Sequence, residues 1–213
     1  MITLKINEIF FSLQGESSYI GIPTIFIRLT GCPMRCSYCD TAYAFHDGKN
    51  MTIQEIFEEI SQYKTKYVTV TGGEPLAQKP CWNLLSQLCD KGYIVSLETG
   101  GAISIEGVDK RAKIILDIKT PDSGENKNNN KTNISMIEKK DEIKFVISSK
   151  EDYEWAKEFI EEEHLNEKAP IIFSPAYENL SYENLSEWIL EDNLEVRFQV
   201  QLHKIIWGEK KGV

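Results

Sequence analysis

The feature that most restricts the fold is a regular alternation of short apolar, β-branched runs with segments of helical pattern. Helices of this length between strands are typical of βαβ units, in which consecutive strands run parallel. The sequence therefore predicts an α/β protein built on a parallel sheet. The predicted strands are residues 4–10, 24–29, 67–71, 94–98, 113–118, 143–147, 171–174 and 195–200.

The helical segments carry start and stop signals. Thr52 and Glu55 have the spacing of a capping box ahead of an apolar stripe. Pro80 suits a first helical turn, and Gly92 suits a position just past a helix end. The predicted helices therefore begin near residues 52, 80, 149 and 181.

The number of elements indicates an incomplete barrel. A full (β/α)₈ barrel usually takes about 250 residues, whereas this chain has 213. We expect a shortened or partial TIM-like (β/α) barrel with about six core parallel strands, as a single domain over residues 1–213. Residues 122–132 are polar and of low complexity, and we expect them to form a mobile loop insertion.

The charge balance excludes some functions. A net charge of −9 argues against a protein whose main task is to grip nucleic acid, because neutralising phosphates requires clustered Lys and Arg. No apolar run approaches the roughly 18 residues that a membrane span needs, and the first residues lack the pattern of a secretory leader. We therefore expect a cytoplasmic protein with no nucleic-acid or membrane partner.

Three cysteines, Cys32, Cys36 and Cys39, stand close together in a C-x3-C-x2-C pattern. In a cytoplasmic protein, grouped cysteines indicate metal or redox chemistry before disulfides. Iron–sulfur clusters are usually held by four thiolates, so three would leave one iron of a four-iron cluster open for a ligand. The triplet follows a predicted strand, which places it at the C-terminal mouth of the barrel, where such folds carry their active sites.

A zinc site completed by His46 is the alternative on spacing alone, because thiolate triplets also suit Zn²⁺. The chain would then be a zinc-stabilised binding module without catalysis. The other cysteines do not support a disulfide. Cys81 and Cys89 lie about 12 Å apart on one predicted helix, beyond the roughly 7 Å that a bridge allows, and we expect them to be buried hydrophobic residues.

A second motif, Gly72-Gly73-Glu74-Pro75, follows the predicted strand 67–71. Paired glycines after a strand allow backbone to approach a ligand closely, and a glutamate carboxylate can accept from an ammonium group. A Gly-Gly pair alone is usually only a turn. At the same barrel mouth as the three cysteines, it indicates a ligand site.

Together the two motifs resemble the radical S-adenosylmethionine (SAM) superfamily over about residues 24–147. The resemblance implies that the three cysteines bind a [4Fe–4S] cluster, whose open iron is chelated by the methionine amine and carboxylate of SAM. It also implies that Gly72, Gly73 and Glu74 form the site for the methionine amino group, and that Tyr38 lies beside the adenine.

Segments near both ends of the chain narrow the resemblance. Residues 8–16, 28–29, 39–45, 117–121 and 199–204 look like the 7-carboxy-7-deazaguanine synthase family. This implies conversion of 6-carboxy-5,6,7,8-tetrahydropterin to 7-carboxy-7-deazaguanine with loss of ammonia, a step towards queuosine and other deazapurine nucleosides. It further implies a homodimer that needs Mg²⁺ and receives electrons from flavodoxin or ferredoxin.

The resemblance also assigns roles at the barrel mouth. Arg28 suits the pterin carboxylate, because a guanidinium donates two parallel hydrogen bonds. Mg²⁺ prefers oxygen ligands, so Thr41 is the expected ligand and Asp40 a second candidate. The other expected substrate contacts are Leu13, Gln14, Gly15, Glu16, Thr71 and His203, and the other expected cofactor contacts are Glu98, Asp117 and Lys119.

Ser17 departs from the family's frequent Gln-Gly-Glu-Gly pattern, in which a glycine follows the glutamate. A serine is tolerated there if the backbone φ angle is negative. The nearest alternative function is an activating enzyme for a glycyl-radical protein, which shares the cysteine spacing and a short barrel. Its protein substrate would not require Arg28, Gln14 or Thr41.

Overall fold

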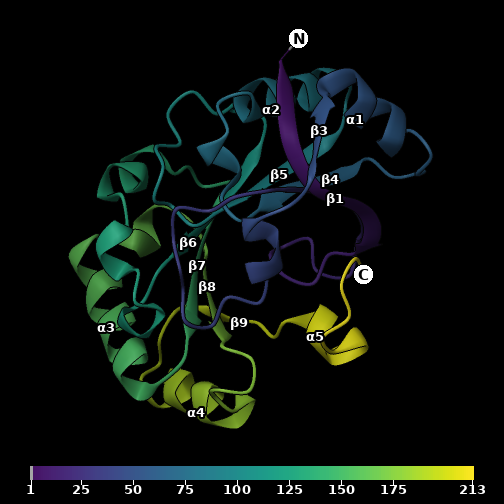
Figure 1. Ribbon diagram of the computed structural model, residues 1–213. Helices are drawn as coiled ribbons and strands as arrows, with labels where there is room; N and C mark the ends of the chain where they lie inside the picture. Colours follow the sequence, from purple (N-terminus) through teal and green to yellow (C-terminus); the bar gives the residue numbers. More distant parts are fainter. Residues whose placement is uncertain (1) are drawn as a thin grey trace.

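The computed structural model describes residues 2–213 and is organised around a nine-stranded sheet with helices on its outside (Figure 1). The strands are β1 (Thr3–Leu13), β2 (Pro23–Leu29), β3 (Lys49–Thr52), β4 (Tyr67–Gly72), β5 (Ile94–Thr99), β6 (Lys113–Ile118), β7 (Glu142–Ile147), β8 (Ile171–Pro175) and β9 (Arg197–Phe198). The helices are α1 (Ile53–Ile60), α2 (Cys81–Asp90), α3 (Lys150–Glu162), α4 (Tyr182–Glu191) and α5 (Leu202–Trp207).

The strands are arranged in the order β3-β1-β2-β4-β5-β6-β7-β8-β9. Every neighbouring pair from β2 onward is parallel, whereas β1 runs antiparallel to both β2 and β3. Six of the parallel strands have at least five residues, and β9 has two. Since β3 and β9 form the two edges of the described sheet, the barrel is open. The predicted partial barrel is confirmed.

The outward faces of the parallel strands form the hydrophobic core. Val70, Leu97, Leu116 and Phe145 are fully buried there and come from four successive strands. Each such side chain contributes roughly 1.5–3 kcal/mol when it leaves water. The helices add Ile56, Ile60, Leu84, Leu88, Tyr153, Ala156, Leu185 and Ile189 to the same core.

The inward faces of the same strands carry many polar residues, although barrel interiors are usually filled by Val, Ile and Leu. Thr69 on β4 lies opposite Ser96 on β5, with their hydroxyl oxygens 2.8 Å apart. Asp117 on β6 lies opposite Lys144 on β7. Because side chains alternate along a strand, core and interior positions alternate as well. The interior of this barrel is therefore available for chemistry.

The helices begin where the sequence predicts. Thr52 and Glu55 form the complete capping box of α1, and the Ser149 and Ser181 hydroxyls accept backbone N–H groups at the starts of α3 and α4. The helix α3 is the longest, with 13 residues. None of the described helices is long and apolar enough to cross a membrane.

Several boundaries and two elements differ from the prediction. β1 continues to Leu13, and β9 contains only Arg197–Phe198. The edge strand β3 and the helix α5 were not predicted, because four and six residues are too short to show a clear hydrophobic period. No helix lies between β5 and β6 in the described chain, and the β6–β7 connection is built of short 3₁₀ segments.

The polar residues 122–132 belong to that β6–β7 connection and contact the end of β6. The Asn129 side chain accepts from the Lys119 N–H at 2.9 Å and donates to the Lys119 carbonyl at 2.8 Å. The Asn130 N–H donates to the Gly101 carbonyl at 3.1 Å. These hydrogen bonds fasten the polar segment to the barrel mouth.

Candidate active site at the barrel mouth

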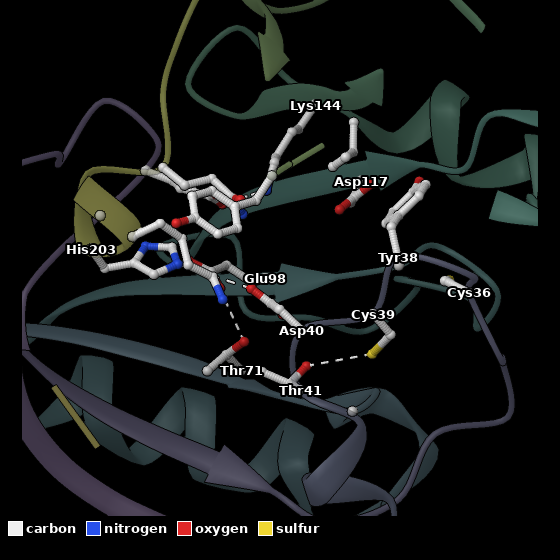
Figure 2. A pocket seen from close by; sticks show the side chains of 18 of the residues that line it. Cys36, Tyr38, Cys39, Asp40, Thr41, Thr71, Glu98, Asp117, Lys144 and His203 are labelled. Atoms are coloured by element: carbon white, nitrogen blue, oxygen red, sulfur yellow. Dashed lines mark hydrogen bonds and ion pairs between the residues drawn. The ribbon is translucent and has the colours of Figure 1, made fainter. Parts of the chain in front are cut away.

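A cavity of about 530 Å³ opens at the C-terminal ends of the parallel strands (Figure 2). Every predicted site residue except Glu74 lines it. In Figure 2, Cys36 and Cys39 are drawn at one end of the pocket and His203 at the other. We call its two parts the cysteine half (Cys32, Cys36, Tyr38, Cys39, Gly72, Gly73, Asp117 and Lys119) and the carboxylate half (Leu13, Gln14, Gly15, Glu16, Arg28, Thr71, Glu98, Lys144 and His203).

The cysteine loop, residues 31–39, is supported by the polar β6–β7 connection. The Ser37 N–H donates to the Ser123 carbonyl at 3.0 Å. The Arg35 N–H donates to Glu125 Oε1 at 2.6 Å. The segment that the sequence predicts as an insertion therefore holds one side of the loop that carries the thiols.

The three thiols of Cys32, Cys36 and Cys39 are half-buried and line the same cavity. Burial raises the pKa of Cys32, and it raises the pKa of Cys36 to about 11. Thiolate ligation would replace these protons by metal. Among residues 2–213, no three His, Cys, Asp or Glu side chains converge on a point that suits a single metal ion. Three grouped thiols that line one cavity are the kind of ligand set that iron–sulfur clusters use.

The zinc site completed by His46 is not supported by the geometry. His46 is exposed and does not line the cavity. Its carbonyl accepts from the Asn7 side chain, and its ring lies against Phe45. Cys81 and Cys89 are buried on α2 as free thiols, as the sequence predicts.

The paired glycines bring two backbone segments into direct contact. A Cβ atom on Gly73 would lie 2.4 Å from the Gly31 carbonyl oxygen and 2.7 Å from the Cys32 Cβ. A Cβ atom on Gly72 would lie 2.4 Å from the Leu29 carbonyl oxygen. The sequence interpretation assigned this space to a ligand. In the structure, part of it is taken by the start of the cysteine loop.

Glu74 is fully buried and lies behind the cavity wall. Its carboxylate accepts from the Thr99 hydroxyl at 2.8 Å, from the Gly100 N–H at 2.9 Å and from the Leu76 N–H at 3.0 Å. Burial raises the pKa of Glu74. The carboxylate therefore caps the short 3₁₀ turn at Pro75–Ala77 and ties it to the end of β5. This position does not support the predicted contact between Glu74 and an ammonium group.

Polar groups without protein partners lie beside the thiols. The Tyr38 hydroxyl and Asp117 Oδ1 are buried, and neither has a hydrogen-bond partner among the described residues. Lys119 Nζ lies 3.0 Å from Asp117 Oδ2 and 6.0 Å from the centre of the Tyr38 ring. Burial raises the pKa of Tyr38 to about 12. Buried groups left unpaired by protein fit a polar ligand that supplies the missing hydrogen bonds.

Arg28 lies on β2 and lines the carboxylate half of the cavity. Its Nε donates to Glu8 Oε1 at 2.7 Å, and the Tyr43 hydroxyl donates to the same oxygen at 2.7 Å. The guanidinium also lies over the rings of Phe10 and Tyr43, at 5.6 and 5.9 Å from their centres. Its two terminal nitrogens donate to no described residue. They remain as a forked donor for a ligand carboxylate.

Gln14 and Glu98 form a network in the barrel interior. Gln14 Nε2 donates to Thr69 Oγ1 at 3.0 Å and to Glu98 Oε1 at 3.2 Å, and Gln14 Oε1 accepts from the Glu16 N–H at 3.2 Å. The second oxygen of Glu98 accepts from the Thr71 hydroxyl at 3.0 Å. Burial raises the pKa of Glu98, and the nearby charge of Glu16 adds to this. Gln14 and Thr71 therefore orient Glu98, which the sequence prediction had placed with the cofactor.

The loop from Gly15 to Ser17 is held by the C-terminal segment. The Gln199 side chain accepts from the Ser17 N–H at 2.6 Å and donates to the Ser17 carbonyl at 2.9 Å. The Leu202 N–H donates to the Gly15 carbonyl at 3.0 Å, and a Cβ atom on Gly15 would lie 2.2 Å from His203 Nδ1. Ser17 has a φ angle of 65°, so the condition of a negative φ is not met. The serine keeps the left-handed conformation that glycine favours.

Asp40 and Thr41 continue the cysteine loop towards His203. The Thr41 hydroxyl lies 3.8 Å from Cys39 Sγ, and His203 Nε2 lies 3.9 Å from Asp40 Oδ2. Partial enclosure would raise the pKa of Asp40, whose side chain is 38% exposed, but the nearby His203 side chain and the charge of Lys204 lower it to about 2. Asp40 is therefore an ionised oxygen donor beside a hydroxyl, which are ligand types that Mg²⁺ accepts.

Two contacts of Glu16 were missed in the sequence. Lys144 lies within β7 and pairs with Glu16 Oε2, and Gln201 Nε2 donates to Glu16 Oε1 at 2.9 Å. A charged residue within a predicted apolar strand was the available signal for Lys144, because inward and core positions alternate. Tyr177, Glu178 and Asn179 also line the cavity, and their loop carries no recognisable motif.

The chain is similar in sequence to known proteins. The model of the radical SAM superfamily matches residues 26–164. A 7-carboxy-7-deazaguanine synthase from Chlorobaculum tepidum is 45% identical over 214 residues, covering 99% of this chain and 97% of the relative. A protein of the same name from Koribacter versatilis is 42% identical over 226 residues, covering 99% of this chain and 100% of the relative.

Solved structures share the fold. The crystal structure of QueE from Escherichia coli matches with a TM-score of 0.74 and 22% identity, covering 95% of this chain and 96% of that one. SuiB from Streptococcus suis, bound to S-adenosylmethionine, matches with a TM-score of 0.54 and 15% identity over 80% of this chain and 45% of that one. At these identities the matches establish a common partial barrel.

Proposed function

This chain belongs to the 7-carboxy-7-deazaguanine synthase family of radical SAM enzymes, and we propose on that premise that it converts 6-carboxy-5,6,7,8-tetrahydropterin to 7-carboxy-7-deazaguanine with loss of ammonia. The family membership supports the activity. The residues of the cavity would divide the work between its two halves.

One observation carries the assignment of roles. A single cavity joins three grouped thiols to a guanidinium whose terminal nitrogens have no described protein partner. Chemistry that starts at a redox centre and acts on an anionic heterocycle requires both sites in one enclosed volume, because water must be excluded between them. The two halves of the cavity meet this requirement.

In the cysteine half, Cys32, Cys36 and Cys39 would ligate three irons of a [4Fe–4S] cluster. The unpaired Asp117 oxygen and the Tyr38 hydroxyl would bind the polar groups of SAM, and Lys119 would balance the charge of Asp117. When bound and reduced, the cluster and SAM would supply the radical chemistry that removes hydrogen from the pterin.

In the carboxylate half, Arg28 would bind the pterin carboxylate through its two terminal nitrogens. Glu8 and Tyr43 hold this guanidinium in place, so little freedom is lost on binding. Glu16 and Glu98 would accept hydrogen bonds from the amine and N–H groups of the ring. Glu98 has the raised pKa, and it is the carboxyl group better suited to exchange a proton with the ring.

Thr41 and Asp40 would contribute oxygen ligands to Mg²⁺, and substrate or water would supply the others. Asp40 remains ionised across the physiological range because His203 and Lys204 lower its pKa to about 2. Thr41 lies next to Cys39. The cation would therefore lie at the boundary between the two halves.

The family also supports a wider assignment of partners. We propose a cytoplasmic homodimer of single-domain chains over residues 1–213, with flavodoxin or ferredoxin as the electron donor and no nucleic-acid partner. The net charge of −9 supports a small-molecule substrate in place of a polyanion. Light scattering on the purified protein tests the dimer. A particle with the 24.4 kDa mass of one chain would contradict it.

The activity is tested by anaerobic incubation of the reconstituted protein with 6-carboxytetrahydropterin, SAM, Mg²⁺ and a chemical reductant. We expect one ammonia for each 7-carboxy-7-deazaguanine formed, and no product when SAM is omitted. Iron-loaded protein that cleaves SAM but leaves the pterin unchanged would overturn the substrate assignment and leave the radical chemistry in place.

A further inference from the structure

Lys144 is a cation in the interior of the barrel. It occupies the third position of β7, a strand whose six residues are all buried, and its side chain is 10% exposed. Removing an ammonium group from water is costly unless a carboxylate pairs with it. Figure 2 shows Lys144 and Asp117 reaching into the pocket from neighbouring strands.

The partner of Lys144 is Glu16, on the loop that follows β1. Lys144 Nζ forms an ion pair with Glu16 Oε2, while Gln201 Nε2 donates to Glu16 Oε1 at 2.9 Å. The Glu16 N–H also donates to the Gln14 side chain at 3.2 Å. One carboxylate, 13% exposed at its side chain, is thus fixed from β7, from the C-terminal segment and from its own loop.

The other cations of the cavity have partners of their own. Arg28 donates to Glu8, and Lys119 lies 3.0 Å from Asp117. Burial favours the protonated form of Glu16, but the charge of Lys144 outweighs it and lowers the pKa of Glu16. Burial also lowers the pKa of Lys144, and the carboxylates of Glu16 and Asp117 raise it above its ordinary value. A strongly held proton makes Lys144 a poor acid and a good fixed charge.

We propose that Lys144 is a positioning residue for the pterin: it keeps Glu16 as an oriented carboxylate that accepts from the ring's amine and N–H donors. This inference rests on the function proposed above. Each carboxylate oxygen has a second lone pair, so both can still accept from a ligand while bound to Lys144 and Gln201. Without the ammonium, burial would favour the protonated form of Glu16, which presents a donor where the ring also presents donors.

The test compares Lys144→Met and Lys144→Arg in the reconstituted holoenzyme. Methionine keeps most of the length of the side chain but has no charge, so we expect the pterin KM to rise about ten- to a hundredfold, the range of one charge-assisted hydrogen bond. The kcat at saturating pterin, the iron content and the reductive cleavage of SAM should change less than about threefold. Arginine should restore part of the lost affinity.

A double-mutant cycle with Glu16→Gln separates positioning from general damage. If Lys144 acts through Glu16, adding Lys144→Met to Glu16→Gln should cost little further affinity, as measured by calorimetry with the pterin. The matched control is Lys140→Met. Lys140 precedes β7, pairs with the buried Asp141 at 2.7 Å and lies outside this cavity, so its loss should leave the KM unchanged.

Three results would overturn the proposal: an unchanged pterin Kd in folded Lys144→Met, full additivity of the two substitutions, or loss of SAM cleavage with pterin affinity intact. If Lys144→Met does not fold, Glu16→Gln and Lys144→Arg still carry the test. Weakened pterin binding in both, with the cluster intact, supports the proposal, and unchanged binding in both rejects it. A parent enzyme that fails to turn over the pterin would instead reject the proposed function.

Discussion

The two halves of the cavity are held together by different kinds of contact. In the cysteine half, Gly73 lies against the backbone of Gly31 and the Cβ of Cys32, with no space for a side chain. In the carboxylate half, side chains hold one another, as in the pairs of Arg28 with Glu8 and of Glu16 with Lys144. Packed backbone has few ways to relax, whereas a polar side chain can be replaced by a similar one.

This difference predicts two kinds of response to substitution. Changes in the cysteine half should be all-or-none, and they should remove the metal centre and SAM binding together. Changes in the carboxylate half should be graded, should leave the metal centre in place and should be partly restored by a conservative residue.

The largest effect is expected from the cysteine triplet. Cys32→Ala, Cys36→Ala and Cys39→Ala should each lose the cluster and all product formation. Three thiolates hold three of the four irons, and each substitution would leave only two protein ligands. Cys81→Ala and Cys89→Ala are the controls, since both thiols are buried on α2 away from the cavity. Iron content and the visible absorption of anaerobic protein measure the outcome. Full iron content in any triplet variant would contradict the assignment.

The next effect is expected from Gly73→Ala. Since the new Cβ would collide with the Gly31 carbonyl and with Cys32, we expect the cysteine loop to shift, with loss of iron as well as SAM binding. Iron analysis and calorimetry with SAM measure the two effects. Loss of SAM binding with full iron content would instead mean that Gly73 only makes room for the cofactor.

Gly100→Ala is the comparison for Gly73→Ala. A Cβ atom on Gly100 would lie 2.2 Å from the end of the Met34 side chain and would meet no backbone so closely. A flexible thioether can move to another rotamer. We therefore expect Gly100→Ala to retain most of its iron. Equal damage by both substitutions would break the distinction between backbone and side-chain contacts.

The sequence predicts the cysteine half better than the carboxylate half, for a physical reason. Its thiols and glycines lie next to strand ends, so local spacing and strand periodicity place them together. The contacts of Glu16 depend on Lys144 and Gln201, which lie 128 and 185 residues further along the chain. No local sequence pattern shows that folding brings these distant segments of the chain together.

Glu74 shows that a motif leaves the direction of a side chain open. The motif places it beside Gly73 and therefore near the ligand, but a side chain's direction depends on the partners around it. Here Thr99 and Gly100 on the neighbouring strand end supply donors that draw the carboxylate into the wall. Sequence adjacency identifies the segment, whereas the orientation within it depends on these contacts, and the contact of Glu74 with an ammonium group stays a prediction.

Arg28 gives a graded effect in the carboxylate half. Arg28→Ala should keep the cluster and SAM cleavage but reduce kcat/KM for the pterin about ten- to a hundredfold, since a hydrogen bond between charged groups contributes roughly 1.5–3 kcal/mol. Arg28→Lys should recover only part of this, because an ammonium lacks the forked geometry. Steady-state turnover and iron content on the same preparations measure the result. Turnover equal to the parent's in Arg28→Ala would remove the pterin carboxylate from this site.

The smallest effect is expected from Ser17, a strained residue that follows Glu16 of the carboxylate half. A left-handed residue with a side chain costs about 1–2 kcal/mol, and Ser17 has a φ angle of 65°. Glycine would remove this conformational cost. Glycine would also give the unfolded chain more conformational entropy, which lowers the stability of the folded protein by roughly 0.4–1 kcal/mol. Both Ser17→Gly and Ser17→Ala lose the hydroxyl that accepts from the Tyr19 N–H, so their difference isolates the backbone.

We therefore expect Ser17→Gly to be more stable than Ser17→Ala by up to about 1.5 kcal/mol, as measured from urea unfolding midpoints. Because Gln199 donates to and accepts from the Ser17 backbone, either variant keeps the contacts that shape the loop. The pterin KM should then change less than twofold in Ser17→Gly. Equal stability of the two variants would mean that Ser17 bears no strain. A large rise in KM with the gain in stability would mean that the strained loop itself contributes to substrate binding.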